Sequence, residues 1–85
     1  MTVELLETME TVSKRYAVSP DQAAELEVDQ AAEELTVIWQ RVTNRASSVL
    51  VTAPAGVDGW AMPVPHRPGW LTDLIVKDAP TWWLP

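Results

Sequence analysis

Apolar residues recur at steps of three and four along the first half of the chain. Within residues 3–16, Leu5, Met9, Val12 and Tyr16 follow such steps, which place them on one stripe of a helix. Acidic residues come before the basic ones in this segment, and the helix dipole favours that order. The pattern therefore predicts a first helix over residues 3–16.

A second helix is predicted to begin at Pro20. Ser19 suits the N-cap, Pro20 suits the first helical position, and Gln22 can complete a capping box. Apolar residues then alternate at steps of three and four, with a lapse only at Arg45. These positions are Ala24, Val28, Ala31, Leu35, Ile38, Val42 and Val49. Such a repeat is a heptad seam, so we expect a mainly α fold: a helical hairpin whose long amphipathic second helix carries a coiled-coil-like seam.

The end of this second helix is open. Residues 47–53 are compatible with a last helical turn or, because Val49, Val51 and Thr52 favour extended structure, with a short strand. Pro54 is expected to end either version. Residues 1–53 thus form the predicted hairpin, which is a candidate for oligomerisation.

Residues 54–85 have a different composition, with all three glycines, six of the seven prolines and four of the five tryptophans. The prolines at 63, 65 and 68 forbid helix and discourage a central strand, which predicts an extended arm. GVDG at 56–59 predicts a plain turn. Helical spacing predicts a short helix near 70–78, and the whole arm is expected to pack on the hairpin or on a neighbouring subunit.

The predicted helices differ in length, and the difference leaves apolar surface without cover. The first spans about 21 Å and the second about 40 Å or more at 1.5 Å per residue. An uncovered apolar patch of this kind normally marks an interaction site, so the tryptophan-rich tail or another copy should cover it. Adjacent Trp82 and Trp83 point in opposite directions if extended, which favours one ring on the chain itself and one on a neighbour. The predicted interface comprises Leu35, Ile38, Trp39, Val42, Val49, Trp70, Trp82 and Trp83.

The charge narrows the classes of partner. Twelve acidic and six basic residues give a formal net charge of −6, which disfavours direct binding to nucleic acid. The sequence has no window apolar enough for a membrane span and begins with an acidic segment unlike a secretory signal. We therefore expect a location in the cytoplasm or within a virion. The composition is typical of GC-rich coding, which suggests a high-GC bacterium or a bacteriophage.

Candidate chemistry is sparse. Glu4, Glu7 and Glu10 step by three, but di-iron bundles also need histidines at a fixed spacing from such carboxylates. The single histidine, His66, lies in the proline-rich arm and is expected to pack against Trp60 or Trp70. A catalytic base needs an orienting partner and a nucleophile, and the sequence places neither beside it. We expect no catalytic residue, metal or cofactor.

Three functions follow from these features. The favoured one is a nonenzymatic interaction or assembly subunit, such as a virion component or an accessory subunit, that docks through its Trp-rich arm on itself or on a larger complex. The first alternative is an acidic inhibitor that mimics nucleic acid and binds a basic protein surface. The second is a small ligand-binding module or enzyme with a Trp-lined pocket. The sequence leaves open the partner, the oligomer number and whether the arm packs in cis or in trans.

Overall fold

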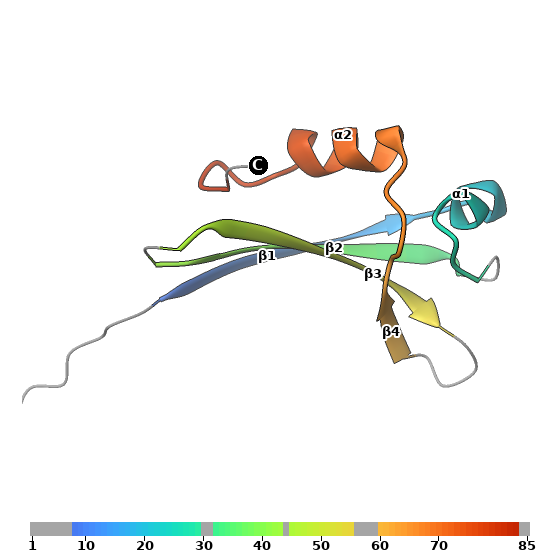
Figure 1. The fold of residues 1–85 in the computed structure, drawn as a ribbon, viewed down its shortest axis with the longest axis horizontal. Helices are drawn as coiled ribbons and strands as arrows, with labels where there is room; N and C mark the ends of the chain where they lie inside the picture. The colour runs from blue at the N-terminus through green and yellow to red at the C-terminus, as the bar shows by residue number, and fades with distance from the viewer. Residues whose placement is uncertain (1–7, 30–31, 44, 56–59, 84–85) are drawn as a thin grey trace, which may run out of the picture.

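The protein is a four-stranded antiparallel sheet with two short helices (Figure 1). A computed structural model describes residues 8–29, 32–43, 45–55 and 60–83. The strands are β1 (Met9–Ala17), β2 (Glu34–Val42), β3 (Ser47–Ala55) and β4 (Trp60–Pro63), and their spatial order follows the chain. The helices are α1 (Pro20–Glu25), between β1 and β2, and α2 (Gly69–Lys77), after β4.

The sheet has one covered face and one open face. Helix α2 and the segment after it lie over one face, and no helix in the part of the chain that the structure describes lies over the other (Figure 1). Leu35, Val37 and Trp39 alternate along β2 on the covered face and are fully buried. Ile38 lies between them and is opposite Leu50 of β3 on the open face. Alternation with period two therefore separates the core from solvent.

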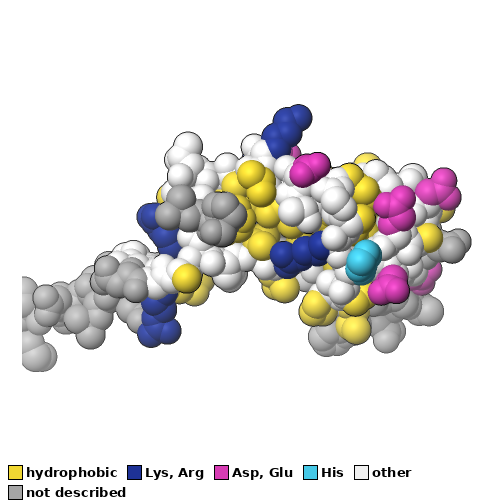
Figure 2. All heavy atoms as spheres, turned by 45° about the horizontal axis from the view of Figure 1, so that its top comes forward, with side chains coloured by type: hydrophobic (Ala, Val, Ile, Leu, Met, Phe, Trp, Pro, Cys, Tyr) yellow, Lys and Arg dark blue, Asp and Glu magenta, His cyan; other side chains and the backbone are white. Residues whose placement is uncertain are grey.

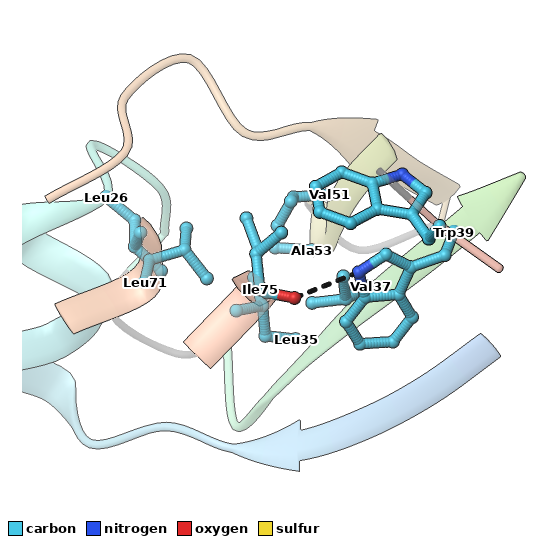
Figure 3. Close-up of a cluster of buried hydrophobic side chains, with 9 residues drawn as sticks. Leu26, Leu35, Val37, Trp39, Val51, Ala53, Leu71 and Ile75 are labelled. Atoms are coloured by element: carbon cyan, nitrogen blue, oxygen red, sulfur yellow. Dashed lines mark hydrogen bonds between the residues drawn. The ribbon is translucent and has the colours of Figure 1, made fainter. Parts of the chain in front are cut away.

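The core lies between the covered face and α2 (Figure 3). Leu71 and Ile75, one turn apart on α2, are buried against the strand residues. The Trp39 indole N–H donates a hydrogen bond of 3.1 Å to the carbonyl of Ile75. Because Ile75 is in the last turn of α2, its carbonyl lacks a partner within the helix. Trp39 thus fills the core and also satisfies the end of α2.

The predicted mainly α fold, with its helical hairpin and coiled-coil seam, is wrong. A step of four residues places side chains on one face of a helix and also on one face of a strand, because four is a multiple of two. Val12 and Tyr16 share a face of β1 in this way, opposite Trp39 and Leu35. Val37, which is absent from the heptad pattern, is buried. The β-branched run around it is the signal that the helical interpretation underweighted.

The helix start at Ser19 is confirmed, but the predicted length is wrong. Ser19 and Gln22 form both bonds of a capping box, yet α1 ends at Glu25. Glu27 follows in the left-handed region with φ of 58°. The amide of Val28 bonds to the carbonyl of Ala23, and that of Glu27 bonds to Ala24, each at 3.1 Å. This is a Schellman motif, so the backbone turns away before a second helical turn is complete.

Residues 47–53, which the sequence left open, are part of strand β3. The prediction that Pro54 ends this segment is wrong, because β3 continues to Ala55 and Pro54 pairs with Ala61 of β4. The described pairing of β2 with β3 stops at Thr36 and Thr52, so the missing N–H of Pro54 breaks no bond of that ladder. Helix α2 lies where a short helix was predicted. The predicted turn at 56–59 lies outside the described residues.

Candidate functional site

The free edge of the sheet along β1 is the candidate functional site. The amide of Thr43 bonds to the carbonyl of Thr8, and the amide of Val18 bonds to that of Glu33, each at 3.0 Å. Both bonds belong to the register in which Met9 lies opposite Val42. Antiparallel strands alternate between hydrogen-bonded and non-bonded pairs, so the even-numbered residues of β1 bond to β2. The odd-numbered residues turn their N–H and C=O groups away from the sheet: Met9, Thr11, Ser13, Arg15 and Ala17.

These five residues form a regular strand edge that is exposed to solvent. All five are exposed, and Met9 retains 63% of its accessible surface. No proline occurs in β1, and its pairing with β2 is continuous over nine residues without a bulge. Short length, proline, bulges and charged side chains are features by which proteins prevent pairing at an edge. Strand β1 has none of the first three, but it carries the charged residues Glu10, Lys14 and Arg15.

The opposite edge, at β4, is much less able to pair. Strand β4 has four residues, and the amide of Val64 bonds to the carbonyl of Val51 at 2.9 Å. The same alternation directs the backbone of Trp60 and Met62 toward β3 and that of Ala61 and Pro63 outward. Pro63 has no N–H to donate. The free edge of β4 therefore offers a single outward amide, from Ala61.

Two side chains on the covered face of β1 contact Asp78, at the end of α2. The Lys14 ammonium donates to the carbonyl of Asp78 at 3.0 Å and lies 5.6 Å from the centre of the Trp39 ring. The Tyr16 hydroxyl donates to a carboxylate oxygen of Asp78 at 2.9 Å. Partial burial, followed by the hydrogen bond and charge of Asp78, raises the pKa of Tyr16 to about 12. These contacts hold β1 against the core, and they leave the backbone groups of its outer edge unpaired.

Two ion pairs join β1 to β2. Arg41 donates to Glu10 at 2.9 Å, and Arg15 lies 3.9 Å from Glu34. All four side chains are partly or largely exposed, so each pair contributes less than about 1 kcal/mol. They matter here for the charges along β1, which carries one acidic residue, Glu10, and two basic residues, Lys14 and Arg15.

The structure places the predicted interface residues in different environments. Leu35 and Trp39 are fully buried within the chain. Ile38 and Val42 are half-buried on the open face, where Ile38 lies opposite Leu50, which is 41% exposed. Val49 is half-buried on the covered face beside Trp39. The structure thus does not bring these residues together on one surface.

The C-terminal tryptophans pack on their own chain. Trp83 is only 9% exposed, and its indole N–H donates to the carbonyl of Ser48 at 3.0 Å. The Arg41 guanidinium lies 5.4 Å from the centre of the Trp82 ring and donates to the Trp82 carbonyl at 3.2 Å. Trp70 donates to Glu25 at 2.6 Å. The described part of the arm therefore covers the sheet in cis.

Figure 2 shows acidic side chains gathered at the end of the molecule that carries α1. Among the described residues, no three potential metal ligands of the histidine, cysteine or carboxylate type come together. His66 is exposed in the segment between β4 and α2. A hollow of about 370 Å³ beside Met62 and Pro65 is lined mainly by apolar groups, with Glu27 and Asp29 among its lining.

Neither described helix is long and apolar enough to cross a membrane.

Sequence reasoning missed the β1 edge because it assigned these residues to a helix. The available signal was the alternation in the partner strand, where Leu35, Val37 and Trp39 alternate with Thr36 and Ile38. That alternation predicts a strand over residues 34–42. It does not reveal which strand lies at the edge, because edge position follows from the pairing of distant segments.

Comparison with protein-family models, with curated proteins and with solved structures finds no match for this chain.

Proposed function

We propose that this chain is a nonenzymatic protein–protein interaction or assembly module that acquires a partner strand along β1. The observation that carries this proposal is the row of outward backbone groups on Met9, Thr11, Ser13, Arg15 and Ala17. No hydrogen bond within the described residues is formed by these groups. An extended segment from a partner can bond to them in sequence and so extend the sheet.

Strand addition suits a surface that offers a regular backbone and few anchoring side chains. Main-chain hydrogen bonds supply affinity in this mode, while side chains at alternate positions supply specificity. Along β1 the alternate positions carry different chemistry. Thr11, Ser13 and Arg15 lie on the open face, whereas Glu10 and Lys14 lie on the covered face. A partner strand would therefore meet Thr11, Ser13 and the charged Arg15 on the open face, and on the covered face charged residues that alternate with Val12 and Tyr16.

The packing of the tryptophans supports an interaction module over a small-molecule site. Trp39, Trp70 and Trp83 each donate their indole N–H to an acceptor in the same chain. A Trp-lined pocket would instead leave rings or polar groups directed at a ligand. The arm in this proposal stabilises the sheet, and the docking surface lies at β1.

Site-specific photo-crosslinking tests this function. A benzophenone amino acid at Ser13, in the cells that produce the protein, should form adducts with another polypeptide, because Ser13 lies at the middle of the free edge. The matched control is the same group at Thr72, which is exposed on α2. Adducts of any mass at Ser13 and not at Thr72 are the expected result. Equal yields at both positions would contradict docking at β1.

A further inference from the structure

We propose that the strand added to β1 is β1 of a second copy of this chain, paired antiparallel about a twofold axis at Val12. This inference rests on the proposed docking at β1 and names its partner. The resulting dimer has one continuous sheet, with both α2 helices on the same face. The proposal follows from the direction of the backbone groups, from the charges along β1 and from the small core.

The backbone limits the possible registers. In a twofold antiparallel pair, the outward residues of one β1 must lie opposite the outward residues of the other, because only these have free N–H and C=O groups. Odd-numbered residues must therefore pair with odd-numbered residues. This condition is met only when the twofold axis passes through a residue position. Registers in which the axis passes between two residues are therefore excluded.

The charges then favour one centre. With the axis at Val12, Glu10 of one copy lies opposite Lys14 of the other, and the symmetry creates this facing pair twice. Within its own chain Glu10 accepts from Arg41 and Lys14 donates to the Asp78 carbonyl, so the facing charge would add to these contacts. Opposite charges at facing positions stabilise a strand pair. With the axis at Lys14, the two Lys14 ammonium groups face each other, and an axis at Arg15 opposes two guanidinium groups. An axis at Ser13 places Lys14 opposite Val12 and forms no direct ion pair.

The Val12 register also places compatible groups at the other positions. Thr11 lies opposite Ser13, Met9 lies opposite Arg15, and Val12 lies opposite its own copy. Val12 is half-buried and packs against the core cluster, so the paired valines would extend the covered apolar layer from one copy into the next. The odd-numbered residues from 9 to 15 provide the hydrogen bonds.

The small core supports a second copy as the partner. The buried apolar side chains form one small cluster, to which the sheet, α2, the end of α1 and Trp83 contribute. A chain of 85 residues buries only roughly 60–65% of the surface that its unfolded form exposes. Small domains without disulfides often gain stability by oligomerisation, and this chain has no cysteine. Pairing at β1 would satisfy the longest free edge of the sheet in both copies.

Cysteine crosslinking tests both the partner and the register, because every introduced thiol is the only one in the chain. The variant Val12→Cys places two thiols at facing, non-hydrogen-bonded positions about 4.5 Å apart between Cα atoms, which a disulfide can span. Ser13→Cys and Thr72→Cys are the matched controls, one residue away and on exposed α2. We expect Val12→Cys to form a covalent dimer at least about 10-fold faster than either control.

Other outcomes would overturn the inference. Faster crosslinking of Ser13→Cys than of Val12→Cys would reject the Val12 register. Equal rates for all three variants, together with a wild-type chain that sediments as a monomer near ~1 mM, would reject the second copy as the partner. Crosslinks from Ser13 to a different protein would then leave docking at β1 intact. Absence of any such adduct would instead reject the proposed function itself.

Discussion

Along β1, five residues turn both backbone groups to solvent, whereas β4 turns only Ala61 and Pro63 outward, and Pro63 has no N–H. These two strands are the edge strands of the same sheet. One edge has the length and regularity to accept another strand, and the other has neither. The difference indicates that pairing is suppressed on one side only, which would limit strand addition to a single partner and prevent open-ended growth of the sheet.

The anchoring of the two edges also differs. Strand β1 is tied to the far end of the chain through Lys14 and Tyr16, which both contact Asp78. Strand β4 leads into α2 through the proline-rich segment. The contacts at Asp78 allow β1 to remain in place although only one of its sides is paired.

The largest effect is expected from Trp39→Ala, which removes the largest fully buried side chain of the core. Trp39 is fully buried and bonds to the end of α2. Loss of a buried aromatic ring typically costs about 3–5 kcal/mol, which is a large fraction of the stability of a small domain. Urea unfolding should show this loss. A change below about 1 kcal/mol would contradict the assigned position of Trp39 in the core.

Next in size is the effect of Ser13→Pro on association. Proline removes an outward N–H from the middle of β1, so that this position lacks a donor as Pro63 of β4 does. Because the inward bonds to β2 come from even-numbered residues, folding should be little affected. We expect the dissociation constant of the dimer to rise at least about 100-fold, as measured by sedimentation over a concentration series.

Lys14→Pro is the matched comparison for that variant. Its amide faces β2, opposite Val37, so proline here leaves the Val37 carbonyl unpaired and also removes the side-chain contact of Lys14 with Asp78. Measured against Lys14→Ala, which removes the side chain alone, the lost backbone bond should cost about 1–3 kcal/mol of folding stability. Similar unfolding midpoints for Ser13→Pro and Lys14→Pro would contradict the assigned directions of the backbone groups. Thr11→Pro provides a second outward position and should resemble Ser13→Pro.

Tyr16 tests the anchoring of β1, and it is the only tyrosine in the chain. Tyrosinate absorbance should titrate near the raised pKa of about 12 in the folded protein and near 10.0 in denaturant. Because the folded-state pKa is the higher one, this contribution to stability is complete below pH 10 and is lost as the pH rises through about 12. Tyr16→Phe should cost about 1 kcal/mol and remove this pH dependence. A normal pKa in the folded state would contradict the partial burial of Tyr16 together with its contact with Asp78.

A smaller and opposite effect is expected from Glu27→Gly. Glu27 adopts a positive φ at the end of α1, where glycine is the usual residue. Its negative charge is also unfavourable near a helix C-terminus. The replacement should stabilise the fold by about 0.5–1 kcal/mol in thermal or urea unfolding. Association at β1 should not change, so this variant separates edge pairing from global stability.

Local signals in the sequence were more informative than long-range ones. The capping box at Ser19 was predicted because its residues lie within four positions and act through local hydrogen bonds. Strand β1 was missed because Val12 and Tyr16, four residues apart, fit the periods of helix and strand equally well. Of Trp82 and Trp83, one ring was predicted to pack on the chain itself and the other on a neighbour. Both contact groups of their own chain, Arg41 and Ser48, which are distant in sequence. The β1 edge depends entirely on such distant pairing.

Pro63→Thr should have the smallest effect and bears most directly on the contrast between the edges. The substitution restores an outward N–H on β4, but only Ala61 and residue 63 would then face a partner. Two residues form too short a ladder for stable pairing, because isolated strand pairs are marginal even when longer. We therefore expect the dissociation constant to change by less than about threefold. Ala61→Thr, at the neighbouring outward position, is the control for added β-propensity. If Pro63→Thr alone produced assemblies larger than a dimer in sedimentation, the missing amide of Pro63, and not the short length of β4, would be what keeps that edge unpaired.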